Sequence, residues 1–218
     1  MWSFLSSDQK KSHLVNQAFE EMSEMLAQDV VLVSGAVECL TGGGDPPSDI
    51  ATIEERINSS ERLIRRLILE HLTLNPEQDL SSSLGLLSVV HDVERIGDYA
   101  KSIVELAGLA PSLSLESDAG REIQQLAVEV PEILRATAEA FGQSDEEAAS
   151  QVMSRHRGIK ERTDALLEKV VGEDSSGYGA VLAVASRYLR RISAHASNVA
   201  SLVVNPLDLV SRNEAGGE

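Results

Sequence analysis

Residues 91–103 read His-Asp-Val-Glu-Arg-Ile-Gly-Asp-Tyr-Ala-Lys-Ser-Ile. This stretch places two carboxylates, Glu94 and Asp98, one helical turn apart in an otherwise apolar-periodic segment. Residues four apart lie on the same face of a helix, with roughly 5–6 Å between their Cβ atoms. Two like charges at that spacing repel each other, and a cation between them would relieve the repulsion. The pattern therefore predicts a helix with an acidic face and a candidate cation site.

Apolar residues recur at helical spacing along most of the chain. In the first such run they stand three or four positions apart, at Phe19, Met22, Leu26, Val30, Val33, Val37 and Leu40. Such a stripe is typical of a helix in a bundle. Similar runs, separated by Gly- and Pro-containing breaks, predict helices at about 9–40, 49–74, 79–108, 117–142, 145–171 and 178–204. Pro131 predicts a kink in the fourth helix, and Ser144 with Glu147 predicts a capping box for the fifth.

The third and sixth predicted helices resemble each other. A shift of 96 positions lays residues 90–103 over 186–199 and matches Arg95 with Arg191, Ile96 with Ile192, and Ala100 with Ala196. This indicates duplication of a three-helix unit. The predicted fold is all-α, with six helices in two tandem, pseudo-symmetric three-helix bundles. The expected divisions are a first repeat at 1–110, a second at 111–206 and a polar tail at 207–218.

Composition limits the possible functions. The formal net charge of −16 at pH 7 argues against binding nucleic acid through the overall field of the protein. Cys39 is the one cysteine, which fits a reducing, cytoplasmic location. No apolar run approaches the roughly 20 residues of a membrane span, so we expect a soluble protein that meets membranes only through partner proteins. No nucleophile, phosphate-loop or metalloprotease motif is present, and we predict that the chain is not an enzyme.

The segment Glu94-Arg95-Ile96-Gly97-Asp98, followed by residues 99–103, resembles the signature of the PhoU family. That signature is Glu or Asp, three residues, then Asp, usually with an Asn-Ile pair one turn later. Its place in the third helix of a six-helix, two-repeat chain also fits. The resemblance covers roughly residues 10–204.

The resemblance implies a function as well as a fold. PhoU-like proteins form two three-helix bundles, tend to oligomerise, and in some cases carry multinuclear metal clusters on their acidic motifs. They act as negative regulators of phosphate uptake that link a phosphate ABC transporter to a sensor histidine kinase, and similar domains accompany sodium–phosphate cotransporters. The resemblance thus predicts a cytoplasmic regulator or accessory protein, dimeric, whose partner is a transporter subunit, a sensor kinase or both.

Glu94 and Asp98 are the predicted metal ligands, because carboxylate oxygen suits divalent and iron-type ions. His91 lies on the same side of the helix, and Glu54 resembles an acidic position of the family; both are weaker candidates. The alternative is that Glu94 pairs with Lys101 or an arginine while Asp98 is a solvated charge. A helical bundle for metal storage or sensing, or an adaptor without any ligand, would be the corresponding alternative functions.

The second repeat departs from the family pattern. Arg190 and Ala194 stand where Glu and Asp are expected, so at most the first repeat keeps the carboxylate pair. Arg187 and Arg190 fall at the positions of His91 and Glu94. Because arginine matches carboxylate and phosphate geometry, the sequence predicts an anion-binding or acidic-partner face at Arg187, Arg190 and Arg191. Ion pairing of these arginines with nearby glutamates is the alternative.

Overall fold

The computed structural model describes residues 12–42, 44, 49–110, 113, 115–173 and 178–205. The described residues form helices and no strands. The helices are α1 (His13–Leu40), α2 (Ile50–Leu74), α3 (Leu80–Leu109), α4 (Asp118–Gln143), α5 (Glu146–Glu173) and α6 (Gly179–Val204). All six predicted helices and the all-α class are therefore confirmed. The predicted start of the first helix at residue 9 and the polar tail at 207–218 lie outside the described residues.

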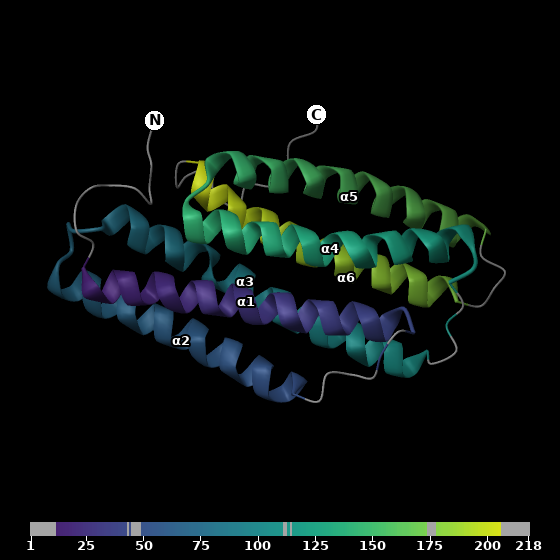
Figure 1. Cartoon of the computed structure of the whole chain (residues 1–218), viewed down its shortest axis with the longest axis horizontal. Helices are drawn as coiled ribbons and strands as arrows, with labels where there is room; N and C mark the ends of the chain where they lie inside the picture. Colours follow the sequence, from purple (N-terminus) through teal and green to yellow (C-terminus); the bar gives the residue numbers. More distant parts are fainter. Residues whose placement is uncertain are drawn as a thin grey trace.

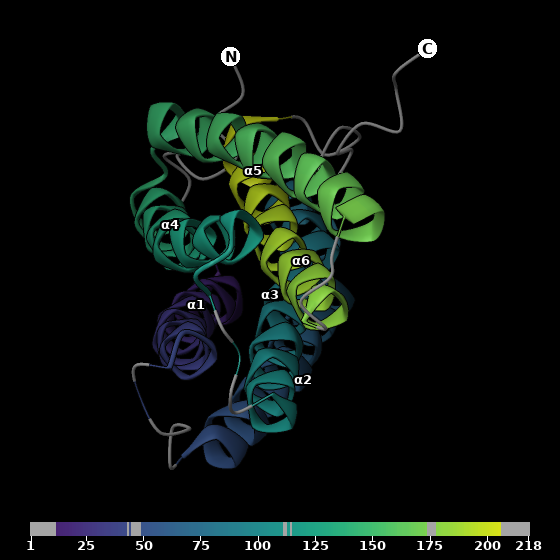
Figure 2. The ribbon, with the colours of Figure 1, turned by 90° about the vertical axis from the view of Figure 1, so that its right-hand side faces the viewer.

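The helices form two layers with an edge helix on either side. Helices α1 and α4 lie side by side in front, α3 and α6 lie behind them, and α5 and α2 occupy opposite edges (Figures 1 and 2). Helix α1 contacts α2, α3 and α4, whereas α6 contacts α3, α4 and α5. The first helix of one repeat thus packs on the first helix of the other, and the third helix on the third.

One aliphatic core runs through both repeats. It includes fully buried side chains of α1, α3, α4 and α6, such as Leu26, Ile96, Leu126 and Ile192. The rings of Phe19 and Phe141 stack with centroids 5.7 Å apart and join α1 to α4. Burial of such side chains contributes about 1.5–3 kcal/mol each, so the continuous core favours folding of the two repeats as one unit.

Polar and aromatic contacts between α3 and α6 reproduce the internal repeat. Asp92 Oδ1 lies 2.7 Å from His195 Nδ1, and the rings of Tyr99 and Tyr188 have centroids 5.8 Å apart. The 96-residue shift carries Asp92 onto Tyr188 and Tyr99 onto His195, so the two contacts are equivalent. Asn198 also donates to Asp92 Oδ1 at 2.6 Å. This equivalence is what two repeats related by a twofold axis would show.

Two details of α4 and α5 refine the sequence predictions. Ser144 is the left-handed C-cap of α4, with φ of 55°, rather than the first residue of a capping box. Asp145 caps α5 instead, because its Oδ1 accepts from the N–H of Ala148 at 3.0 Å. Helix α4 continues through the buried Pro131 as one element.

Candidate functional site

The acidic motif of α3 faces α2 and α1. Glu94 is largely buried, and its Oε2 lies 3.2 Å from His91 Nδ1. The same imidazole nitrogen lies 3.6 Å from Oε1 of Glu61 on α2. His91 therefore stands between two carboxylates, one from its own helix and one from α2.

A third carboxylate, Asp29, approaches Glu94 from α1. Asp29 is fully buried, and neither of its carboxylate oxygens has a hydrogen-bond partner among the described residues. Oε2 of Glu94 is likewise buried without a hydrogen bond in the described part of the chain. Gly97 makes room for this arrangement, because a Cβ there would lie 3.2 Å from both Asp29 Oδ1 and Ile57 Cδ1.

Burial and mutual repulsion set the electrostatics of these acids. Burial raises the pKa of Asp29 well above its usual range, and the negative charge of Glu94 raises it further. The pKa of Glu94 is also raised, first by burial and then by the charge of Asp98. Both acids therefore hold a proton more readily than in the unfolded chain.

The other predicted ligands are engaged by cations of their own. Asp98 accepts a hydrogen bond of 2.6 Å from Arg95, and Glu54 accepts one of 2.9 Å from Lys101. The bond to Glu54 and its charge raise the pKa of Lys101. Lys101 thus pairs with Glu54 rather than with Glu94. Among the described residues, no three His, Cys, Asp or Glu side chains are arranged to hold a metal ion.

Asp29 and Glu61 were not recognised as site residues from the sequence. Asp29 stands among buried apolar positions of α1, and a lone acid at a core position is the signal that could have identified it. Glu61 lies in α2 within a run of charges that also includes Arg62, Arg65 and Arg66. Only the packing of α2 on α3 distinguishes Glu61 from those neighbours.

The second repeat carries a different arrangement at the equivalent place. Arg190, the counterpart of Glu94, forms an ion pair with Asp164 of α5. Ser193, the counterpart of Gly97, lies 2.9 Å from Nδ1 of the buried His156. Burial, followed by the charges of Arg190, Lys160 and Arg157, lowers the pKa of His156 to about 4.

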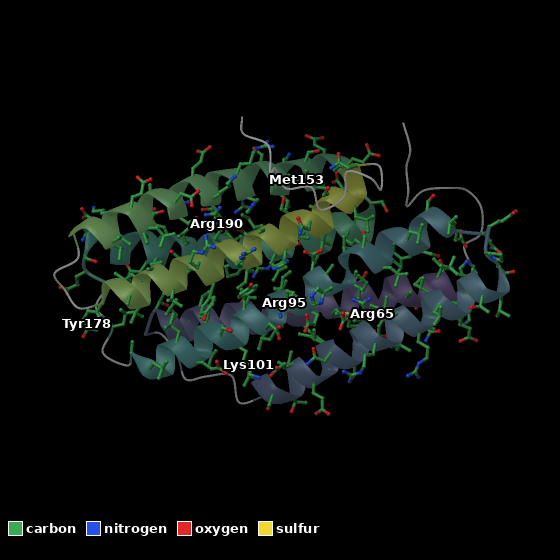
Figure 3. The ribbon with its side chains drawn as sticks, turned by 180° about the vertical axis from the view of Figure 1, so that it is seen from behind. Arg65, Arg95, Lys101, Met153, Tyr178 and Arg190 are labelled. Atoms are coloured by element: carbon green, nitrogen blue, oxygen red, sulfur yellow. The ribbon has the colours of Figure 1, made fainter. Side chains whose placement is uncertain are left out.

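The three predicted arginines separate into two kinds. Arg190 forms an ion pair within the chain, with an aspartate rather than with one of the glutamates that the alternative named, whereas Arg187 and Arg191 are exposed on α6. Figure 3 views this side of the molecule, with Arg190 on α6 and Arg95 and Lys101 on α3. The face formed by α3 and α6, here called the α3–α6 face, therefore presents the guanidinium groups of Arg187 and Arg191 on a protein whose net charge is strongly negative.

These features define a class of protein: a two-repeat helical bundle with an Asp/Glu motif on the third helix and no catalytic constellation recognised in its sequence. The PhoU domain model matches residues 22–107 and 123–203, one segment in each half of the chain. The chain belongs to the PhoU family.

Relatives of known name match over nearly the whole chain. A Pseudomonas putida protein named phosphate-specific transport system accessory protein PhoU homolog is 28% identical over 212 residues, covering 88% of this chain and 82% of its own. A Synechocystis protein of the same name is 26% identical over 204 residues, covering 85% and 89%.

Solved structures share the fold. The PhoU of Pseudomonas aeruginosa superposes with a TM-score of 0.71 at 22% identity, covering 87% of this chain and 93% of that one. The phosphate transport system regulatory protein PhoU of Streptococcus pneumoniae gives 0.74 at 17% identity, covering 94% and 98%. None of the described helices is long and apolar enough to cross a membrane.

Proposed function

We propose that this protein regulates phosphate uptake and phosphate signalling as an accessory protein of a phosphate transport system. The observation that carries the proposal is the match of the PhoU domain to both repeats, together with Glu94 and Asp98 at the motif position of α3. The names of the Pseudomonas and Synechocystis relatives support the same role. The protein would act by protein–protein contact in the cytoplasm, and as a homo-oligomer.

The α3–α6 face is the proposed contact surface. Arg187 and Arg191 are exposed there, and arginine forks bind carboxylates in two-point contacts. An acidic surface of a transporter subunit or of a sensor histidine kinase would be their partner. Docking would hold uptake or signalling in check while phosphate is abundant.

Complementation tests this role. The chain would be expressed in a bacterial strain lacking its own PhoU homologue, and uptake of radiolabelled phosphate would be measured in phosphate-rich medium. We expect the intact chain to lower uptake and the Arg187→Glu/Arg191→Glu variant to fail despite equal expression. Uptake that the intact chain leaves unchanged would contradict the proposal.

A second candidate function, metal storage or sensing, draws on the buried carboxylate oxygens of Asp29 and on Glu94 Oε2, which accept no hydrogen bond in the described part of the chain. Carboxylate oxygen of this kind suits a divalent or iron-type ion. Glu94 and Asp98 would hold the ion, with His91 and Glu54 as further donors, and the ion would neutralise the buried charges. Against this candidate, Asp98 and Glu54 are already paired with Arg95 and Lys101.

Elemental analysis separates the two candidates. Metal content of the purified protein would be measured by plasma mass spectrometry for the wild type and for Glu94→Ala/Asp98→Ala. Near-stoichiometric metal that is lost in the variant would establish the motif as a metal site. Equal metal content in both proteins would eliminate metal binding at this motif and leave the regulatory role untouched.

A further inference from the structure

Residues of α1 and α4 line a groove between these two helices. Figure 1 shows α1 and α4 in front of α3 and α6. The groove has a volume of about 570 Å³. Apolar groups of Val37, Ala127, Val128 and Pro131 line it, and polar side chains of both helices form the rest. None of these residues belongs to the acidic motif or to the α3–α6 face.

One exposed apolar side chain lines the groove. Val128 is 65% exposed, whereas the exposed Val31 of α1 lines a separate hollow with Ile53 and Arg56 of α2. Helices α1 and α4 run antiparallel, since Phe19 stacks on Phe141 while Thr41 and Gln124 line the same groove. The exposed Val128 beside the buried Val37, Ala127 and Pro131 favours an apolar side chain in an occupant.

The groove also offers a backbone acceptor. Pro131 lies inside α4 and has no N–H, so the carbonyl of Ala127 lacks the donor it would otherwise have one turn later. Ala127 and Pro131 both line the groove. A polar side chain of an occupant could donate to this carbonyl.

Opposite charges stand at the two ends of the groove, where Glu132 also lines the wall near Arg135 but pairs with Arg155 of α5. Glu38 lies toward the C-terminal end of α1, and Arg135 lies toward the C-terminal end of α4. Because the helices are antiparallel, these two residues mark opposite ends, separated by roughly three helical turns or 15 Å. Neither has an ion-pair partner in the described part of the chain.

We propose that the α1–α4 groove binds one amphipathic helix of a partner protein. The apolar face of that helix would cover Val128 and the groove floor. Helices commonly carry acids in their first turn and bases in their last, so the first turn would meet Arg135 and the last turn Glu38. The bound helix would span about three to four turns and run in the direction of α1.

A designed peptide tests the proposal on the full chain. The probe is a fluorescein-labelled, terminally capped helix of about 14 residues, with leucines on one face, glutamates in the first turn and lysines in the last. We expect saturable binding by fluorescence anisotropy. Val128→Asp should weaken it at least about tenfold. Val171→Asp is the matched control, because Val171 is 83% exposed on α5, and it should bind like the wild type.

Charge reversal tests the predicted direction. Glu38→Lys/Arg135→Glu should weaken binding of the original peptide and make it bind in the opposite direction. A spin label at the last turn of the peptide reports the direction, because it should then broaden NMR signals near residue 135 instead of residue 38. Circular dichroism confirms folding of each variant. The proposal is overturned by the absence of saturable binding to the wild type, or by equal binding to Val128→Asp. It is also overturned by dimerisation of the wild type that Val128→Asp abolishes, because a second copy would then be the occupant.

Discussion

The two repeats keep the same helix at the same place and give it opposite electrostatics. In the first repeat, Glu94 of α3 and the buried Asp29 of α1 have raised pKa values. In α6, the equivalent Arg190 pairs with Asp164, and nearby His156 has a lowered pKa. The comparison shows that a duplicated bundle conserves its apolar packing while the polar groups at its centre diverge.

The two regions should respond to pH in opposite directions. A carboxyl with a raised pKa favours the folded state when protonated, so stability falls as pH rises above the unfolded value near 4. A histidine whose pKa is lowered to about 4 is neutral in the folded state, so stability falls as pH drops below about 6.5. In the wild type these two opposite changes of stability with pH partly cancel, and variants of single residues should reveal each change separately.

The largest predicted effect belongs to His156. In the wild type, lowering the pH from 7 to 4 should cost roughly 3 kcal/mol at this residue, from a pKa of about 4 in the folded state against 6.5 unfolded. His156→Leu should lose that part of the pH dependence, while Ser193 keeps its 2.9 Å bond to the carbonyl of Arg190. Urea unfolding of both proteins across this range measures the difference. Parallel pH profiles would contradict the assignment.

Steric space at Gly97 gives the next effect. A side chain there would press on Asp29 and Ile57 at 3.2 Å, so Gly97→Val should lower the free energy of unfolding by about 2 kcal/mol. Gly158→Val is the control, because a Cβ at this helical glycine meets nothing within 4 Å and valine is a better helix former than glycine. Equal loss in both variants would show that the space around Gly97 is not limiting.

Neutralising Asp29 should stabilise the protein. Asp29→Asn removes a carboxyl group whose charged form is disfavoured in the folded state, first by burial and then by the charge of Glu94. At pH 7 the free energy of unfolding should therefore rise by on the order of 1 kcal/mol. Below about pH 4 the difference should disappear, because Asp29 is then protonated in the unfolded chain as well as in the folded one. Chemical denaturation in the presence of a chelator measures both values. A loss of stability at pH 7 would mean that ionised Asp29 has a favourable partner.

The smallest effect concerns Arg190. Its partner Asp164 is half-exposed, so Arg190→Ala should cost less than about 1 kcal/mol. Removing this positive charge should nevertheless move the pKa of His156 upward, since Arg190 is the leading electrostatic cause of its depression. Titration of the imidazole by NMR checks the shift. An unchanged pKa would assign the depression to burial and the other cations.

Sequence reasoning predicted the six helices because their apolar residues follow a helical period and their ends carry Gly or Pro breaks. It did not find Asp29, because one acid in an apolar stripe does not alter the period. Nor did it find the pairing of Lys101 with Glu54 or of His195 with Asp92. Those partners lie far apart in the chain, and only helix packing brings them together. Prediction of the acidic motif rested on local spacing, whereas its surroundings depend on tertiary contacts.

The most direct test is to measure the pKa values of Asp29 and His156 in one NMR titration of the metal-free wild type. The carboxyl carbon of Asp29 should titrate well above the usual range for aspartate, because burial and Glu94 disfavour its charge. The imidazole of His156 should titrate near 4. An ordinary value for either group, near 4 for Asp29 or near 6.5 for His156, would contradict the opposite electrostatics of the two repeats.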